Sequence, residues 1–287
     1  MQWKDRQGNP VPGEDGQDKM LAFLYGTALG RGIVSLMIRP WVSALAGKLM
    51  DSRVSALAIR PFLAKNAIDL QDYEQRKWRS FNDFFTRRIR EGKRPVDAQP
   101  GHLIAPCDSK LSVYSITGDA RFLVKQTEYT LESLLRSREL AKRYEGGVLL
   151  LFRLTVGDYH RYSYPDGGVK GENVRLNGVF HTVNPVANDH YPIYKENTRE
   201  YTILDSENFG PMLLMEVGAT MVGRIVNYHG ACSVQRGQEK GRFEFGGSTV
   251  IVCLEKDRVI LDEDLVRNTR EGIETVVKLG EKIGTLV

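Results

Sequence analysis

Residues 243–252 read Phe-Glu-Phe-Gly-Gly-Ser-Thr-Val-Ile-Val, which places two glycines between two strand-like runs. Phe243 and Phe245 alternate with a polar residue, and the run 250–252 is β-branched and apolar. Glycine in such a pattern marks a hairpin, a bulge or a close backbone approach. Ser248 follows the glycines directly, so its hydroxyl lies beside the preceding carbonyl. These residues allow two interpretations: an ordinary turn, or a peptide bond that Ser248 itself attacks.

The chain around this stretch changes character near residue 99. Short apolar or β-branched runs, separated by Gly, Asn, Asp and Pro, indicate a succession of strands. They fall at 113–116, 148–154, 169–176, 201–204, 212–217, 221–226 and 250–254, with a helix expected at 131–144. The predicted fold class is α+β: a helical N-terminal layer followed by a compact, mainly antiparallel β-rich domain. The expected parts are a flexible leader at 1–17, a helical region at 18–98 and the β-rich domain at 99–287.

The helical region has an apolar stripe at helical spacing. Its members are Leu21, Leu24, Tyr25, Ala28, Leu29, Ile33, Leu36 and Met37. Asp18 is expected to cap the start of this helix, and a second helix is expected at 81–89 after Ser80. The stripe fits either a layer packed on a core or a layer lying on a membrane surface, and the pattern alone does not separate the two.

Charge and cysteine content set further limits. The net charge of +4 is too small to indicate nucleic-acid binding. A local basic stretch could face phosphates or an anionic bilayer, or be an ordinary solvated face. It comprises Arg76, Lys77, Arg79, Arg87, Arg88, Arg90, Lys93 and Arg94. The three cysteines, Cys107, Cys232 and Cys253, lack metal-ligand spacing, which favours reduced thiols without a zinc or other metal site.

Three polar residues stand next to predicted strands and are candidates for chemistry. Asp108 precedes a strand, His160 lies in a polar, aromatic segment after one, and Ser248 begins one. Together they could form a nucleophile, a base and an orienting acid. The spacing alone is weak support, because most chains of this length contain such a trio.

Six segments in order make the sequence resemble the phosphatidylserine decarboxylase family. They are Ser80-Phe81-Asn82-Asp83-Phe84-Phe85-Thr86-Arg87 with Arg94-Pro95-Val96; Ala105-Pro106-Cys107-Asp108; Asp158-Tyr159-His160-Arg161-Tyr162; His181-Thr182-Val183-Asn184-Pro185; Phe209-Gly210-Pro211-Met212 with Val217-Gly218-Ala219-Thr220-Met221-Val222-Gly223; and 237–243 running into Gly246-Gly247-Ser248-Thr249. They span about residues 80 to 255.

The resemblance implies a self-processing enzyme that converts phosphatidylserine to phosphatidylethanolamine and CO₂. Ser248 would cut the Gly247–Ser248 bond and become a covalent pyruvoyl group, which forms a Schiff base with the substrate amine. Asp108 would orient the histidine, and His160 would be the main acid and base. The cleaved β chain (1–247) and α chain (248–287) would form a heterodimer, or a homodimer of that unit. The resemblance also makes 18–98 a membrane-associating region and 99–287 the catalytic domain. It implies a peripheral location at the cytoplasmic face of the cell membrane, with the basic stretch and the N-terminal helices against anionic lipid.

The sequence departs from the family pattern at one position that bears on mechanism. A second histidine commonly follows the first by three residues, and here Ser163 stands there. His160 could serve both the cleavage and the decarboxylation, or His181 could be an accessory acid or base. Gly246, where the family often has leucine, is a smaller departure.

Three other functions remain compatible with the residues. They are a pyruvoyl decarboxylase of a soluble amino acid, a non-enzymatic lipid-binding relative, and a Ser-His-Asp hydrolase.

Overall fold

The computed structural model describes residues 2–12, 21, 23–66, 68–124, 127–183, 187, 191–219, 224–244 and 248–287. Gly246 and Gly247, part of the strand expected at 221–226, and Asp18 with its expected cap lie outside these ranges.

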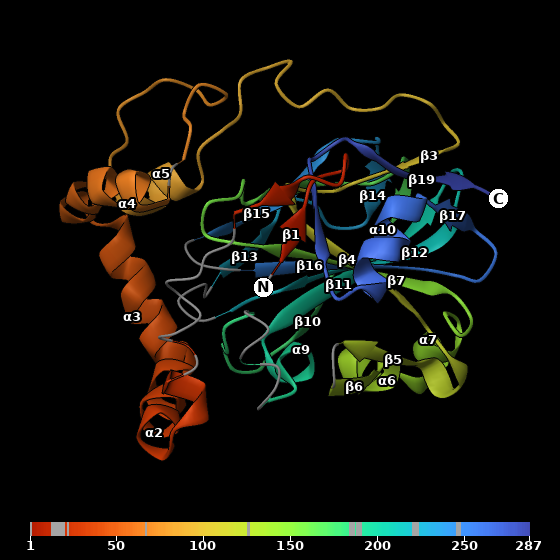
Figure 1. Cartoon of the computed structure of the whole chain (residues 1–287), viewed down its shortest axis with the longest axis horizontal. Helices are drawn as coiled ribbons and strands as arrows, with labels where there is room; N and C mark the ends of the chain where they lie inside the picture. The colour runs from red at the N-terminus through yellow and green to blue at the C-terminus, as the bar shows by residue number, and fades with distance from the viewer. Residues whose placement is uncertain are drawn as a thin grey trace.

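The described residues form one sheet of eleven strands, antiparallel except where β1 pairs with β18 (Figure 1). Its order is β14 (Cys232–Val234), β9 (Gly168–Lys170), β11 (Arg199–Ser206), β12 (Gly210–Val217), β16 (Ser248–Leu254), β7 (Val148–Leu154), β4 (Ser109–Ser115), β18 (Glu274–Val277), β1 (Trp3–Lys4) and β2 (Pro10–Val11), with β10 (Val174–Leu176) beside β11. The expected antiparallel β-rich region is confirmed.

Both faces of this sheet are covered, because its central strands contribute to two separate apolar cores. Ile251 and Cys253 pack on one face with Leu149 and Leu151. Val250 and Val252 pack on the other, among a second set of buried residues. A strand buried on both faces has no need of alternating polar residues, which explains the continuous apolar run at the C-terminal part of β16.

Smaller elements cover the sheet. Two three-stranded sheets have the orders β13 (Arg224–Asn227), β15 (Glu239–Glu244), β8 (Arg161–Ser163) and β17 (Val259–Leu261), β19 (Lys282–Leu286), β3 (His102–Ile104). A hairpin joins β5 (Arg121–Val124) to β6 (Thr127–Thr130). The short helices in this part are η2 (Gly118–Ala120), α6 (Leu131–Leu135), α7 (Arg138–Lys142), α9 (Ile193–Glu196) and α10 (Glu263–Arg270).

The N-terminal helices lie at one side of the sheet, and Figure 1 shows them in orange at the left. They are α2 (Ala28–Met37), α3 (Pro40–Asp51), η1 (Arg53–Ala58), α4 (Ile59–Asn66) and α5 (Phe81–Phe85). Thr27 caps α2 by accepting from the Gly30 N–H, and Ser80 caps α5 by accepting from the Asp83 N–H. Among the described residues no single helix is long and apolar enough to cross a bilayer; only Ala28–Met37 and Trp41–Asp51 together pass that test, with a 67° bend between them.

Within the expected leader at 1–17, Trp3 and Lys4 pair with β18. Two local expectations are wrong. The expected helix at 131–144 is two helices, since Arg136 adopts a left-handed conformation and ends the first. The expected helix at 81–89 ends at Phe85, and Ile89 instead forms a β-bridge with Tyr73.

Candidate active site

Ser248 is the first residue of β16, and strands lie on both sides of it. It pairs with Leu154 of β7, while the next residue, Thr249, pairs with Val217 of β12. The Ser248 side chain is fully buried, and its Oγ has no hydrogen-bond partner among the described residues. A buried hydroxyl without a partner costs stability, so such an atom points to a function.

Strand alternation assigns Ser248 to one face of the sheet. Side chains two residues apart share a face, so Ser248 lies on the side of Val250 and Val252. On that side the apolar core includes Tyr162 of β8 and Phe243 of β15. The sheet β13–β15–β8 therefore covers the face on which the Ser248 hydroxyl lies.

His160 lies in the same region, immediately before β8. Its Nδ1 is 2.9 Å from the Asp158 carbonyl oxygen, and its own carbonyl accepts from the Phe243 N–H at 2.9 Å. The Phe85 ring of α5 packs on the imidazole, with 4.1 Å between centroids. The ring is fully buried, and Nε2 has no partner within the described part of the chain.

The environment keeps His160 neutral. Burial lowers its pKa to about 4, against the opposing influence of the Asp158 carboxylate. A neutral imidazole whose Nδ1–H donates to a carbonyl has a free lone pair at Nε2. His160 can therefore accept a proton at Nε2 at neutral pH.

The Asp158 carboxylate fixes the turn that carries His160, a role the sequence did not reveal. It accepts from Lys110 Nζ at 2.7 Å and from the Thr155 N–H at 2.7 Å. Although burial raises the Asp158 pKa, these contacts hold it below its usual value. Lys110 follows Asp108 by two residues and is the only charged residue of β4, and this was the available signal.

In the described part of the chain the Asp108 carboxylate binds groups other than His160, so its orienting role stays a prediction. Its carboxylate accepts from Arg94 Nε at 3.0 Å and Nη2 at 2.7 Å, and from the Leu279 N–H at 2.9 Å. Lys278 Nζ lies 3.6 Å away. Since His160 Nδ1 is bound to a backbone carbonyl, a linear Ser-His-Asp relay through Asp108 is not formed, and this disfavours the hydrolase alternative.

Ser163 also uses its polar groups on the backbone. Its N–H and Oγ both donate to the Pro106 carbonyl oxygen, at 2.8 and 3.3 Å, and the side chain is buried. A serine hydroxyl with a pKa far from neutrality is also no substitute for imidazole as a general base. The structure therefore leaves His160 as the histidine of this corner.

His181 lies elsewhere and has contacts of its own. Its Nδ1 is 3.5 Å from the Tyr25 hydroxyl, its Nε2 is 3.3 Å from the Glu196 carboxylate, and its ring stacks on Tyr191. Burial lowers its pKa to about 4. Its accessory acid–base role remains a prediction without a contact to Ser248 or His160 in the described part of the chain.

Two members of the basic stretch are structural. The Arg87 guanidinium is buried over the Tyr73 ring at 4.3 Å and donates to the Gly157 carbonyl. Arg94 binds Asp108 and Asp72. The expectation that the whole stretch meets lipid is therefore wrong for Arg87 and Arg94.

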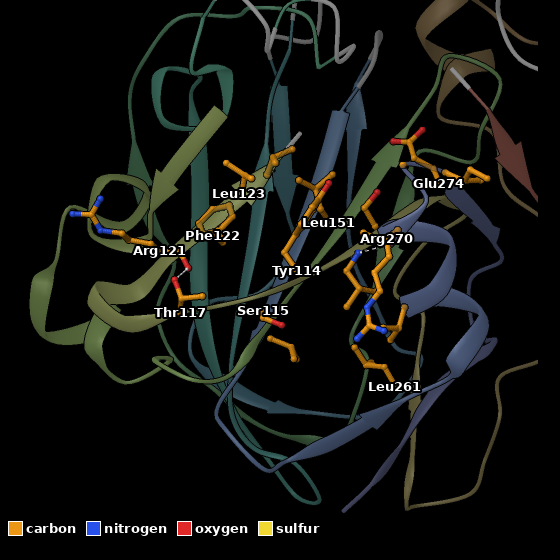
Figure 2. Close-up of a pocket in the computed structure, with 18 of the residues that line it drawn as sticks. Tyr114, Ser115, Thr117, Arg121, Phe122, Leu123, Leu151, Leu261, Arg270 and Glu274 are labelled. Carbon is orange, nitrogen blue, oxygen red and sulfur yellow. Dashed lines mark hydrogen bonds between the residues drawn. The ribbon is translucent and has the colours of Figure 1, made fainter. Parts of the chain in front are cut away.

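The largest cavity recorded for the described residues is not the site. Figure 2 shows it between Tyr114 of β4, Phe122 of β5 and Arg270 of α10, with a volume of about 670 Å³. Its wall includes Val148, which pairs with Leu254 at the far end of β16 from Ser248.

Comparison with known proteins agrees with this geometry. The family model described as phosphatidylserine decarboxylase matches residues 81–285. Phosphatidylserine decarboxylase proenzyme 2 of Clostridium acetobutylicum is 42% identical over 92% of this chain and 91% of its own. The proenzymes of Clostridium novyi and Fusobacterium nucleatum are 41% and 38% identical, over 93% and 92% of this chain and 93% and 90% of theirs.

The chain belongs to the phosphatidylserine decarboxylase family. The family model's match to this decarboxylase-family chain covers α5, Asp108, His160, His181 and Ser248. It starts after the helices α2 to α4.

The Asp108–Arg94 pair in this decarboxylase-family chain yields a stability prediction. Asp108→Asn should cost about 3 kcal/mol of unfolding free energy, because Arg94 would lose its buried countercharge and keep only the more exposed Asp72. Denaturant unfolding measures this loss, and Arg94→Met in the same background should recover most of it. An Asp108→Asn chain as stable as the wild type would contradict the structural role.

Proposed function

We propose that this chain is a self-processing decarboxylase that converts phosphatidylserine to phosphatidylethanolamine and CO₂. Family membership supports the reaction, and the relatives' description as proenzymes supports processing. The proposal rests on two buried atoms, Ser248 Oγ and His160 Nε2, that have no hydrogen-bond partner in the described part of the chain. Ser248 is paired with Leu154 of β7, and the Phe243 N–H of β15 donates to the His160 carbonyl.

Self-processing uses these two side chains. Ser248 Oγ attacks the carbonyl carbon of Gly247 while its proton passes to His160 Nε2. The Gly247–Ser248 C–N bond breaks as an ester C–O bond forms, and the freed nitrogen takes a proton. Elimination at Ser248 then releases a carboxylate at the end of chain 1–247, and hydrolysis with loss of ammonia leaves a pyruvoyl group on chain 248–287.

The residues present fit such a group, because Ser248 and His160 are both fully buried and His160 Nε2 has no partner in the described part of the chain. When formed, the pyruvoyl group supplies an electron sink for the electrons of the broken C–CO₂ bond. His160 moves a proton at the carbon that loses CO₂, and Phe85 and the Asp158 carbonyl hold its ring in place. Burial of both side chains excludes water from the reacting atoms.

The two cleaved chains stay together through the central sheet. Strand β16 follows the cut and is hydrogen-bonded along its length to β12 and β7. Every residue of β16 is buried. The heterodimer of 1–247 and 248–287 therefore needs no covalent link, and its further pairing into a homodimer is a separate part of the proposal.

The acid dependence of cleavage follows from His160. Its pKa is lowered to about 4, so the imidazole loses its accepting lone pair only when the pH falls towards 4. We expect the cleavage rate to be level between about pH 5.5 and 7.5 and to fall on the acid side with an apparent pKa near 4. Gel analysis of newly made chain at each pH measures this. An acid limb centred at about 6.5, the ordinary histidine value, would contradict it.

Membrane contact is proposed for the outer side of α2 and α3. Large apolar side chains there are exposed although neighbouring ones are buried. They are Leu29, Ile33, Leu36, Trp41, Leu45 and Leu49. An exposed apolar helix face with flanking arginines and lysines is suited to the headgroup boundary of an anionic bilayer. The three free cysteines favour the reducing, cytoplasmic side of that membrane.

The membrane proposal predicts a loss of vesicle binding. Trp41→Ser/Leu45→Ser/Leu49→Ser should weaken binding to vesicles containing anionic lipid at least tenfold, since burial of each side chain contributes about 1.5–3 kcal/mol. Flotation measures the bound fraction. Leu123→Ser/Ile260→Ser, which removes two exposed apolar side chains outside the helices, is the control and should bind normally. Equal flotation of the triple variant and the control would contradict the proposal.

A further inference from the structure

A second cavity separates α3 from the edge of the main sheet, and neither self-processing nor vesicle binding uses it. We name it the α3 cavity; its volume is about 400 Å³, within the roughly 300–1,000 Å³ of small-molecule sites. Its polar and charged lining includes Ser43, Lys48, Asp51, Arg175, Arg224 and Glu244. Asn82 of α5 and Thr198, just before β11, also line it.

The α3 cavity lies beside the proposed reaction centre. Gly218, which follows Val217 of β12, binds the Thr198 carbonyl, and Val217 pairs with Thr249 of β16. Two strand spacings therefore separate the backbones of Thr198 and Ser248, which is about 10 Å. Alternation along β11 and β16 puts both side chains on the same face of the sheet. The short helix α5 connects the two places, since Asn82 lines the cavity and Phe85 packs on His160.

Cations outnumber acids in this lining, and the acids have partners. The lining contains the cations Lys48, Arg175 and Arg224 and the acids Asp51 and Glu244. Arg175 also lies 3.8 Å from Glu200, outside the lining. Asp51 accepts from the Asn82 side-chain amide, and Glu244 accepts from Arg242 at 2.9 Å as well as from Arg224 at 3.3 Å. The excess positive charge favours an anion in the cavity.

Ser43 gives an independent indication that the α3 cavity binds a ligand. Its side chain is only 2% exposed, yet Oγ has no hydrogen-bond partner among the residues described. It projects from the inner side of α3, whose outer side carries the exposed Trp41, Leu45 and Leu49. A buried hydroxyl donor next to cations is matched by an oxyanion acceptor such as a phosphate oxygen.

We propose that the α3 cavity binds the phosphodiester of the lipid substrate. Arg175 and Arg224 supply donors and positive charge, Lys48 adds charge at the rim, and Ser43 donates from α3. This assignment rests on the proposed function, because a phosphatidylserine amine at residue 248 must carry its phosphate only a few bonds away. The acyl chains then leave along the apolar outer side of α3, towards the membrane.

The first test measures binding of glycerophosphoglycerol, a soluble phosphodiester with no amine, to the full chain by calorimetry. Arg175→Gln/Arg224→Gln should weaken its affinity at least tenfold, and Ser43→Ala several-fold. The double arginine change should leave the fold intact, because both acidic partners keep another contact. Glu244, the partner of Arg224, keeps Arg242, and Glu200, which lies 3.8 Å from Arg175, keeps Asn227. Arg138→Gln/Lys256→Gln removes the same charge from exposed positions and should bind as the wild type does.

The second test separates binding from chemistry in the processed enzyme. For phosphatidylserine in mixed micelles, Arg175→Gln/Arg224→Gln should raise KM about tenfold with kcat within threefold and with unchanged self-cleavage. Unchanged affinity and KM, or an equal effect in the control pair, would overturn the cavity assignment. Inorganic phosphate binding as tightly as glycerophosphoglycerol would also overturn it in favour of a general anion site. A wild type that neither cleaves nor decarboxylates would defeat the proposed function, while the calorimetry would still decide the cavity.

Discussion

Replacement of Ser248 by alanine is expected to leave a single uncut chain of 287 residues, while the wild type splits before Ser248. Without Oγ no ester can form at Gly247, so cleavage should be abolished rather than slowed. Electrophoresis of chain purified under identical conditions measures this. Since Ser248 Oγ has no partner to lose among the described residues, the variant should fold at least as stably as the wild type.

Thr249→Ala is the matched control for this experiment. Thr249 carries an equally buried hydroxyl without a partner in the described part of the chain, one residue further along β16. Alternation directs it to the opposite face of the sheet, away from His160. The Thr249→Ala chain should therefore still split. Cleavage of Ser248→Ala, or a complete block in Thr249→Ala with Ser248 present, would refute the assigned nucleophile.

Loss of the His160 imidazole should produce the second large effect. His160→Ala is expected to lower self-cleavage by about 10²–10⁴-fold, the usual range for removal of a general base. Chain that does become processed should show a similar deficit in CO₂ release, because the same side chain serves both steps. Radiolabelled CO₂ release per processed chain separates the two effects.

His102→Ala is the control for His160→Ala, since His102 is a partly exposed histidine that binds Asp97 at 2.9 Å. It should retain cleavage and turnover. Full activity in His160→Ala would remove His160 from the mechanism. If His160→Ala loses both its activity and its cooperative thermal unfolding transition, the loss of activity is assigned to folding. His160→Gln, which fills the same space, then separates a folding defect from the loss of the general base.

The sequence predicted those parts of the fold that depend on local pattern. The run 148–154 is β7 residue for residue, and 212–217 and 250–254 lie within β12 and β16. Such apolar runs are long enough to identify a strand, although not its neighbours. The pairing of Trp3 with Glu274 was out of reach, because a two-residue strand has no periodicity and its partner lies at the other end of the chain.

The candidate site was predicted only in part, for a related reason. Ser248 and His160 were found from motifs, and both side chains are fully buried in the structure. The orienting role of Asp108 stays a prediction, because sequence order says nothing about which cation reaches a carboxylate, and Arg94 binds this one. The α3 cavity likewise joins residues from six separate segments, so no local sequence pattern predicts it.

Intact mass spectrometry of the purified wild-type chain tests most directly whether the chain cuts itself before Ser248. We expect two masses: that of residues 1–247, and that of residues 248–287 reduced by the difference between serine and a pyruvoyl group. The smaller chain should also resist N-terminal sequencing, because it has no free amine. A single mass for all 287 residues, in protein that is folded and has been kept at neutral pH, would contradict the account.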